Sequence, residues 1–456
     1  MTFAKPFVVS LFVFAFSLSV AAADLTVTSN ADLPDANPGD GVCTTAGGGV
    51  CTFRAAVQET NALSGADTIY FDFAAPTSIT LGLGEVLIND NVTISGSKMP
   101  ADIWLIGNGA SRVLSVLRAG ITVTIRGVTI SNGVTTGNNP GGGIYVAAAN
   151  ISLENVVVRD NISGASGGGV YSGTGVLRFI NSTASGNIAQ GNGGGGGISV
   201  QGNNSLIQRS NIINNQAPRG GGGVEVSGGT TTIVETTLDN NYTNGGGGGL
   251  LAVFGTANIS RSTISNNTAY RSGGGIALPY GNVTLVNSTV SGNTVSNGGG
   301  GGINTGENGS IGYLTVRNST IVSNTSLYSG GVTGGYAAGV RIGNSILSGN
   351  VALTGPNINS QFTSLGGNLV SDRSGSMGYL ETDLPDGTNP MLGPLANNGG
   401  PTKTHALLAG SPAINFGLNS GVSDLATDQR GKGFLRLVGQ NVDIGAFEFV
   451  GKMGSR

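Results

Sequence analysis

The stretch STISNNTAYRSGGGIAL, residues 262–278, decides the fold because close versions of it recur along the chain. In each version a short segment of aliphatic and, in most cases, hydroxyl residues leads to an Asn. Three or more glycines and another aliphatic residue follow. Neighbouring versions begin at residues 156, 182, 236 and 288. Self-similarity of this kind indicates a repeat protein, in which each unit buries its apolar face only against its neighbours.

The recurrent Asn gives the period of the repeat. Its steps are 26, 28, 26, 26, 26, 31 and 26 residues, through Asn161, Asn187, Asn215, Asn241, Asn267, Asn293, Asn324 and Asn350. Three columns stay apolar along the repeats: the residue after the glycines, and the columns that contain Ile259 and Ile264. Short segments such as Ile-Tyr-Val at 144–146 alternate with the period of two that is typical of β-strands.

These features predict an all-β fold, a single-stranded right-handed parallel β-helix with three short strands per coil of about 26 residues. We expect about nine to eleven coils, and the handedness follows from the rule for parallel crossovers. No apolar stripe with helical spacing accompanies the repeats, which excludes a helical solenoid. An N-terminal helix and an irregular C-terminal segment are expected to cap the open ends of the stack.

The Asn and the glycines have structural explanations in such a fold. Coils stack about 4.8 Å apart, so an Asn at a corner can pass amide hydrogen bonds along the stack. Glycine allows a positive φ and a sharp turn where a Cβ would clash. Neither feature implies a ligand.

The composition narrows the class of protein. Glycine contributes 82 of 456 residues and charged residues only 10%, against about 25% in an average globular protein. The glycines follow no collagen period, and aliphatic residues are plentiful enough for a core. The formal net charge is −3, which argues against a nucleic-acid partner because that would need clustered Lys and Arg.

The N-terminus predicts export. Residues 1–23 have a Lys, an apolar run and small residues before Asp24, which is the pattern of a signal peptide. A membrane anchor is the alternative, although the run is short for a span, and no later segment is long and apolar enough to be a transmembrane segment. We therefore expect a secreted, extracellular protein in which Cys43 and Cys51 form a disulfide, with two free thiols as the other possibility.

The mature chain divides into three predicted segments: an N-terminal cap at 24–75, the β-helix at 76–360 and a C-terminal capping module at 361–456. In the first, CTFRAAVQETNAL at 51–63 predicts a helix with Thr52 as its N-cap. Asp32, Asp35 and Asp40 lie in a Gly/Pro-rich loop, where they could bind calcium or cap turns. We predict no other cofactor.

Three resemblances support an exported β-helix protein. The GGGI segments and Ile264-Ser-Asn-Asn267 are similar to the GGA-I/L/V and FxxN repeats of chlamydial polymorphic outer-membrane proteins, which implies an adhesin. DLPDANPGDGVC and CTFRAAVQETNA resemble the CSLREA-type N-terminal domain, with Phe53 and Ala55 in place of its Leu and Glu. LGPLANNGGPTKTHALLAGSPAINFG and VDIGAFEF resemble the choice-of-anchor Q module, which implies surface association.

Charged residues are scarce, so a cluster of them marks the candidate sites. One corner column is mostly Asn, but three successive coils carry Arg209, Glu235 and Arg261 there. This is either a ladder of ion pairs between coils or a carbohydrate site. The same coils add Arg219, Glu225, Asp239 and Arg271. The four arginines are candidate ligand-binding residues. Glu225 with Glu235 or Asp239 is the candidate carboxylate pair of a glycosidase.

The sequence leaves two main functions open. The first is a secreted or cell-surface structural or adhesive protein that binds a polysaccharide or another cell-surface component without catalysis. The second is a polysaccharide lyase or glycoside hydrolase that acts in a lateral groove of the β-helix. A third is an outward hydroxyl array for ice or crystalline polymer, suggested by pairs such as Thr263 with Ser265 and Thr289 with Ser291. His405, the only histidine, is predicted to make a structural hydrogen bond.

Overall fold

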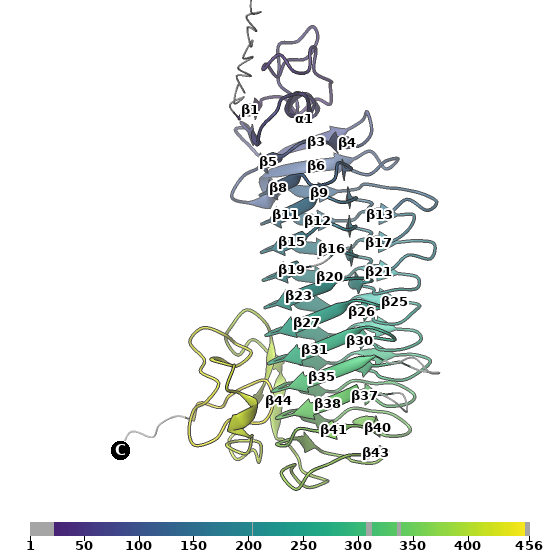
Figure 1. Cartoon of the computed structure of the whole chain (residues 1–456), viewed down its shortest axis with the longest axis vertical. Helices are drawn as coiled ribbons and strands as arrows, with labels where there is room; N and C mark the ends of the chain where they lie inside the picture. Colours follow the sequence, from purple (N-terminus) through teal and green to yellow (C-terminus); the bar gives the residue numbers. More distant parts are fainter. Residues whose placement is uncertain (1–21, 203, 307–311, 335–338, 452–456) are drawn as a thin grey trace, which may run out of the picture.

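The computed structural model describes residues 22–202, 204–306, 312–334 and 339–451, so the predicted signal peptide lies almost wholly outside the described residues. The described chain winds into a tall stack of parallel coils (Figure 1). Helix α1 (Phe53–Ala62) lies near one end of the stack, and a C-terminal module lies against its side near the other. The stack is a right-handed parallel β-helix of about 11 turns, which confirms the predicted fold class.

Three long sheets form the walls, and the first, sheet one, runs along the whole stack. Its strands, in spatial order, are β1 (Asp24–Val27), β2 (Asp67–Phe71), β5 (Val92–Ser95), β8 (Thr122–Arg126), β11 (Asn150–Glu154), β15 (Leu177–Ile180), β19 (Ser205–Gln208), β23 (Thr230–Val234), β27 (Thr256–Ser260), β31 (Asn282–Val286), β35 (Tyr313–Arg317), β38 (Gly339–Gly343) and β41 (Thr363–Ser364).

Sheet two follows sheet one in every coil. Its strands are β3 (Thr77–Leu81), β6 (Ile103–Gly107), β9 (Thr129–Ser131), β12 (Val157–Arg159), β16 (Thr183–Ser185), β20 (Asn211–Ile213), β24 (Thr237–Asp239), β28 (Thr263–Ser265), β32 (Thr289–Ser291), β36 (Thr320–Val322), β39 (Ile346–Ser348) and β42 (Leu369–Val370). A short fourth sheet comes next, with β13 (Ile162–Ser163), β17 (Ile188–Ala189), β21 (Gln216–Ala217), β25 (Tyr242–Thr243), β29 (Thr268–Ala269) and β33 (Thr294–Val295).

Sheet three completes the coil. Its strands are β4 (Val86–Ile88), β7 (Leu114–Val116), β10 (Ile144–Val146), β14 (Val170–Ser172), β18 (Ile198–Val200), β22 (Val224–Val226), β26 (Leu250–Ala252), β30 (Ile276–Ala277), β34 (Ile303–Asn304), β37 (Val332–Thr333), β40 (Ile358–Gln361) and β43 (Ser376–Met377). Outside these sheets lie the antiparallel pair β44 (Leu392–Ala396) and β45 (Thr404–Leu407) and the 3₁₀ turns η1 (Pro100–Asp102) and η2 (Asn419–Gly421).

The apolar columns predicted from the repeat meet in register. Val170 lies between Ile144 and Ile198, and Ile259 lies opposite Leu285 in the next coil. All five side chains are buried in one continuous core. Burying an aliphatic side chain contributes about 1.5–3 kcal/mol, so the stacked columns supply the main stabilisation of the fold.

The corner between sheet two and the fourth sheet carries the predicted asparagine ladder. Asn241 shows the pattern: its Nδ2 donates to Asn267 Oδ1 at 2.9 Å and to the Ile212 carbonyl at 2.8 Å, and its backbone N–H also donates to Asn267 Oδ1. The same contacts link Asn161 through Asn350, and these side chains are almost completely buried. The prediction of stacked amides is therefore confirmed.

A second ladder, of hydroxyl groups, lies at the corner between sheets one and two. The backbone N–H of Thr236 donates to Ser262 Oγ at 3.2 Å, and that hydroxyl donates to the Ser260 carbonyl at 2.8 Å. Equivalent residues continue it: Ser182, Ser210, Ser288, Ser319 and Ser345. The sequence interpretation did not foresee this ladder, although the recurrent Ser/Thr before each sheet-two strand was its signal.

The residue before each hydroxyl of this ladder adopts the left-handed backbone conformation. The φ angles of the eight residues of this column lie between 47° and 53°, at Asn155, Asn181, Arg209, Glu235, Arg261, Asn287, Asn318 and Asn344. Asn tolerates this conformation better than other residues with a side chain, apart from Asp. The Asn preference in this column therefore comes from the backbone and not from amide stacking.

The glycine runs form the remaining tight corner, as predicted. Gly167 has a φ of +70°. A Cβ on Gly168 would lie 2.3 Å from the carbonyl oxygen of Gly196 in the next coil. Side chains are excluded here because backbone passes directly over backbone.

The N-terminal segment contains the predicted helix. Thr52 caps α1 by accepting a hydrogen bond from the Ala55 N–H, and Phe53 and Val57 are fully buried. The Cys43–Cys51 disulfide is present, which confirms that prediction. β1 and β2 of this segment also pair within sheet one, so strand stacking starts before the helix.

The C-terminal module covers the outer face of sheet two. Leu407, Ile444 and Phe447 form a second apolar cluster with Val322 and Ile346 of that sheet. The module thus packs beside the stack (Figure 1), and its place differs from that of a lid over the last coil. The module therefore packs against the outward-facing side chains of sheet two from β28 to β39.

Docking buries the hydroxyl pairs. Thr289 Oγ1 donates to Gln429 Oε1 at 2.6 Å, and Ser291 Oγ lies 2.9 Å from His405 Nε2. The other ring nitrogen of His405 donates to the Gly393 carbonyl, and burial lowers the pKa of this histidine. His405 is structural, as predicted. The prediction of an exposed hydroxyl array is wrong at Thr263, Ser265, Thr289 and Ser291, because these side chains are almost completely buried.

Candidate functional site

The three predicted carboxylates lie on different parts of the coil. Glu225 is in β22 of sheet three, and Asp239 is in β24 of sheet two. Glu235 occupies the left-handed corner between sheets one and two. A glycosidase needs two carboxylates facing one another across a single bond. The structure does not bring Glu225 together with either of the others.

Glu225 packs against a glycine run. Its carboxylate accepts a hydrogen bond from Ser199 Oγ at 3.2 Å, and burial raises its pKa. A Cβ added to Gly194 would lie 2.7 Å from the carboxyl carbon of Glu225. The side chain therefore fills the space beneath the glycines.

The Arg209–Glu235–Arg261 column contains one ion pair. Arg261 Nε lies 3.0 Å from Glu235 Oε1. Among the described residues Arg209 has no ion pair within 4.0 Å, so the predicted ladder is complete only between the last two coils. Arg261 is partly covered by the C-terminal module, since Thr402 Oγ1 donates to its carbonyl at 3.0 Å.

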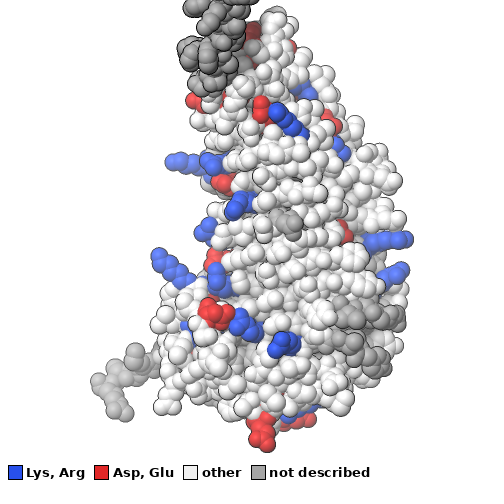
Figure 2. Space-filling view, in the orientation of Figure 1, with Lys and Arg blue, Asp and Glu red and all other residues white. Residues whose placement is uncertain are grey.

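The other two arginines share a depression in the wall. A hollow of about 600 Å³ is lined by Arg219, Tyr270 and Arg271, and it adjoins one of about 340 Å³ lined by Leu251 and Arg219. The hollows share Arg219, and none of the described residues that line them is acidic. We call them together the basic groove. Figure 2 shows basic side chains projecting from the side on which Figure 1 places β21 and β25.

The guanidinium groups of the basic groove are available to a ligand. Arg219 and Arg271 are exposed, and within the part of the chain that the structure describes neither forms an ion pair. Tyr270 is 46% exposed beside them. At the other end Phe254 and Tyr280 stack with ring centroids 5.6 Å apart, each next in sequence to a residue that lines the groove. The sequence named the arginines, but it did not indicate these aromatic residues.

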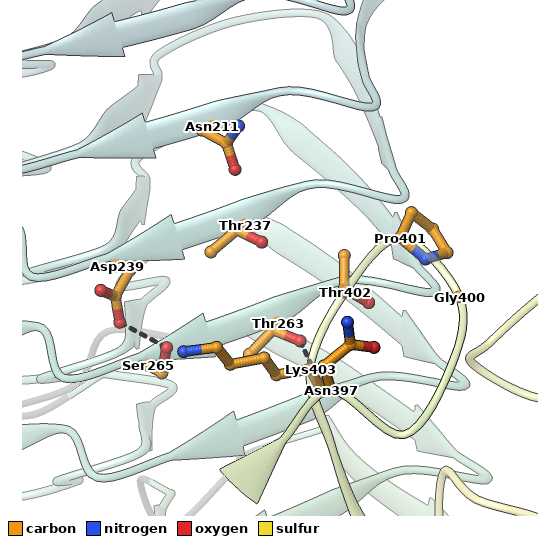
Figure 3. A pocket seen from close by; sticks show the side chains of 10 residues that line it. All are labelled: Asn211, Thr237, Asp239, Thr263, Ser265, Asn397, Gly400, Pro401, Thr402 and Lys403. Carbon is orange, nitrogen blue, oxygen red and sulfur yellow. Dashed lines mark hydrogen bonds between the residues drawn. The ribbon is translucent and has the colours of Figure 1, made fainter.

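A separate cleft lies where the C-terminal module meets sheet two. Asp239 and Ser265 line its sheet-two side, and Lys403 and Asn397 its module side (Figure 3). Its volume is about 290 Å³. Lys403 lay outside the sequence-predicted sites because nothing in the repeat connects it with Asp239.

The aspartates of the N-terminal loop are not gathered together. Asp32 forms an ion pair with Arg54 at 2.6 Å, Asp35 accepts a hydrogen bond from the Thr44 N–H, and Asp40 accepts one from Val42. No group of three or more His, Cys, Asp or Glu side chains suited to a metal ion occurs among the described residues. The contact of Asp40 with Val42, two residues away, supports the turn-capping role that the sequence left open, whereas the contact of Asp35 crosses to a bridged segment.

Comparisons with known proteins agree with the observed β-helix fold. A family model described as a right handed beta helix region matches residues 172–363. A crystal structure of the pectate lyase Pel9A superposes with a TM-score of 0.51 at 13% identity, over 94% of this chain and 97% of that one. No curated protein matches the sequence. No helix among the described residues is long and apolar enough to span a membrane. The chain is a β-helix repeat protein whose fold is like that of a pectate lyase.

Proposed function

We propose that this chain is a secreted or cell-surface structural or adhesive protein that binds acidic glycans without catalysis, through the basic groove. The observation that carries the proposal is the pair Arg219 and Arg271 on adjoining hollows, exposed and without an ion pair to any described residue. Guanidinium groups bind carboxylate and sulfate groups through paired hydrogen bonds. An acidic polymer supplies such groups at regular spacing.

The aromatic side chains fit the same ligand. Tyr270 lines the basic groove and is exposed. Phe254 and Tyr280 are also exposed, stack on each other, and each follows a residue that lines the groove. An apolar ring face can pack against the C–H face of a sugar, while the neighbouring polar groups bind its substituents. Arginines with exposed aromatic residues nearby therefore favour an acidic polysaccharide over a simple anion.

The N-terminal pattern and the disulfide support export. The position of the carboxylates supports binding without hydrolysis, since Glu225 is packed beneath glycines and Glu235 is paired with Arg261. A lyase or glycoside hydrolase is the second candidate function. The observation that favours it is the cleft that holds Asp239 beside Lys403, on a fold like that of a pectate lyase.

Binding and turnover should be measured together on the mature chain. We expect polygalacturonate, alginate and hyaluronate to be retained by the immobilised protein, with dextran passing through. Retention should fall steeply with added salt because exposed charges are screened. Under the same conditions no new reducing or unsaturated ends should accumulate. Accumulation that disappears in Asp239→Asn would favour the enzyme.

Arginine variants locate the interaction. Arg219→Ala and Arg271→Ala should each weaken retention of the acidic polymer at least fivefold, and the double variant should abolish it. Arg178→Ala is the matched control, because Arg178 is an exposed arginine on β15 of sheet one. Equal losses in Arg178→Ala and the groove variants would reject the groove as the binding site.

A further inference from the structure

The cleft between the C-terminal module and sheet two has a fixed shape. Thr263 Oγ1 donates to the Lys403 carbonyl at 2.6 Å, and Gln429 Nε2 donates to Thr402 Oγ1 at 3.0 Å. These bonds hold the module loop over β28, while β24 and β20 remain uncovered beside it. The cleft lies between the edge of this loop and the uncovered part of sheet two, so its walls come from segments about 140 residues apart.

The floor of the cleft is rich in hydrogen-bond acceptors. The hydroxyl protons of Thr263 and Ser265 are both committed, to the Lys403 carbonyl and to Asp239 Oδ1, so toward a ligand their oxygens can only accept. Thr263 Oγ1 already accepts from Gln429 Nε2 at 3.0 Å, which leaves Ser265 Oγ and Asp239 as the main acceptors. Asn266 Nδ2 also donates to Asp239 Oδ1, at 2.8 Å. Asp239 Oδ2 receives no hydrogen bond from any described residue. A ligand in the cleft must therefore supply several O–H or N–H donors.

The rim adds donors and a compensating charge. The Lys403 side chain extends toward Ser265 and Asp239 (Figure 3), and within the described chain its ammonium forms no ion pair. Asn211 and Asn397 contribute exposed amides. Lys403 and Asp239 carry opposite charges at one opening, so their fields largely cancel there. A charged ligand would lose hydration in the cleft without meeting a net opposite charge.

We propose that this cleft is a second binding site, which takes one neutral sugar residue. Hydroxyl groups of a sugar both donate and accept, so they satisfy the acceptor-rich floor and the donors of the rim at once. The volume of about 290 Å³ is at the lower end for small-molecule sites, which limits the occupant to a single ring. The site differs from the basic groove in its place, charge and ligand, and it does not depend on the proposed function.

Three compounds with the same ring test whether the cleft prefers a neutral ligand: methyl α-glucopyranoside is neutral, glucosamine is cationic and glucuronate is anionic. Methyl β-galactopyranoside is a second neutral probe. Binding to the full mature chain should be followed by saturation-transfer NMR and titration. We expect a neutral glycoside to bind with a millimolar Kd, and the charged compounds of the same ring to bind at least fivefold more weakly. Stronger binding of a charged compound, or no binding of either neutral probe, would overturn the proposal.

Matched variants place the probe in the cleft. Ser265→Ala and Lys403→Ala should each weaken binding of the neutral glycoside at least tenfold. Ser185→Ala changes the same column of sheet two outside the cleft, and Lys432→Ala removes another exposed lysine of the module, so both should bind normally. Arg219→Ala should bind the neutral probe normally even where it loses acidic polymer. Unchanged binding in Ser265→Ala and Lys403→Ala would refute this placement.

Discussion

At the scale of single residues, backbone conformation decides what occupies the corner between sheets one and two. Every residue of that column has a φ near +50°, including Arg209, Glu235 and Arg261. This conformation destabilises a residue with an ordinary side chain by about 1–2 kcal/mol, and it destabilises Asn by less. Charged residues at three successive corners thus reduce stability slightly, and only the Glu235–Arg261 pair recovers part of the cost.

Arg209 tests this explanation. Since it has no ion pair with a described residue, Arg209→Asn should raise the free energy of unfolding by up to about 1 kcal/mol through relief of the left-handed backbone. The change is measured as a shift in the thermal midpoint. Arg178→Asn makes the same replacement in β15, where the backbone is extended, and should bring no gain. A destabilised Arg209→Asn variant would contradict the backbone explanation.

The triple replacement of Arg209, Glu235 and Arg261 by Asn removes one partly exposed ion pair and relieves the left-handed backbone at three corners. A partly exposed pair near the surface contributes only about 0–1 kcal/mol, so this variant should be at least as stable as the parent chain. It should also keep its retention of acidic polymer, because the basic groove lies elsewhere. The measurement is the retention of acidic polymer by the triple variant. Lost retention would show that the glycan site lies at this column and not in the basic groove.

At the scale of elements, the corners hold the coils in register. Each amide of the asparagine ladder satisfies backbone and side-chain groups of two neighbouring coils, and the hydroxyl ladder does the same at another corner. Buried polar groups without partners are costly, so each rung depends on its neighbours. Asn241 therefore contributes more to the free energy of unfolding than its own hydrogen bonds would alone.

Asn241→Ala should lower the free energy of unfolding by about 3 kcal/mol or more, because it leaves the Asn215 amide and backbone N–H without their acceptor. Asn258→Ala is the control, since Asn258 is exposed on β27. Denaturant unfolding followed by circular dichroism compares the two variants. Equal stability of Asn241→Ala and Asn258→Ala would show that the ladder contributes nothing.

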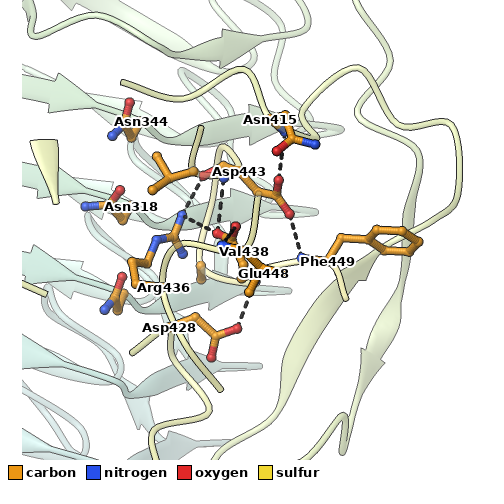
Figure 4. A network of polar contacts seen from close by, with 12 residues as sticks. Asn318, Asn344, Asn415, Asp428, Arg436, Val438, Asp443, Glu448 and Phe449 are labelled. Carbon is orange, nitrogen blue, oxygen red and sulfur yellow. Dashed lines mark hydrogen bonds and ion pairs between the residues drawn. The ribbon is translucent and has the colours of Figure 1, made fainter. Parts of the chain in front are cut away.

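At the scale of the whole molecule, the C-terminal module depends on a buried charge network (Figure 4). Glu448 accepts hydrogen bonds from the backbone N–H groups of Val438 and Asp443, both at 3.1 Å, and lies 3.7 Å from Arg436. Arg430 and Asp428 form a second buried pair beside it. Burial raises the pKa of Glu448 to about 7, against the opposing charge of Arg436, and it also raises the pKa of Asp443.

This network makes module stability depend on pH. A carboxyl whose folded pKa lies above its unfolded value of 4.5 binds its proton more tightly when folded. Its contribution is therefore fully present below pH 4.5 and falls as the pH rises to about 7. Thermal midpoints should drop across that window, and Glu448→Gln should flatten the profile. Glu381→Gln, at an exposed carboxyl, should retain the slope. A slope that Glu448→Gln leaves unchanged would assign the pH dependence to other groups.

The sequence by itself determined the stacked part of the molecule. A period of about 26 residues places equivalent residues above one another, so the apolar columns, the asparagine ladder and the glycine corner could be predicted from their spacing. The helix at Phe53 and the Cys43–Cys51 bond were also local features. Each of these depends on residues that are close in sequence or repeat at a constant interval.

Only the tertiary structure decided where the sites lie. The repeat did not show that Arg219 and Arg271 share one groove while Arg209 and Arg261 lie elsewhere, because the face of a loop residue depends on how the glycine corner turns. Nor could it bring Lys403 to Asp239, since the module that carries Lys403 has no repeat. Its position on sheet two is set by apolar packing and by hydrogen bonds between residues about 140 positions apart. Contacts at that separation follow no period, so they become visible only when the chain is folded.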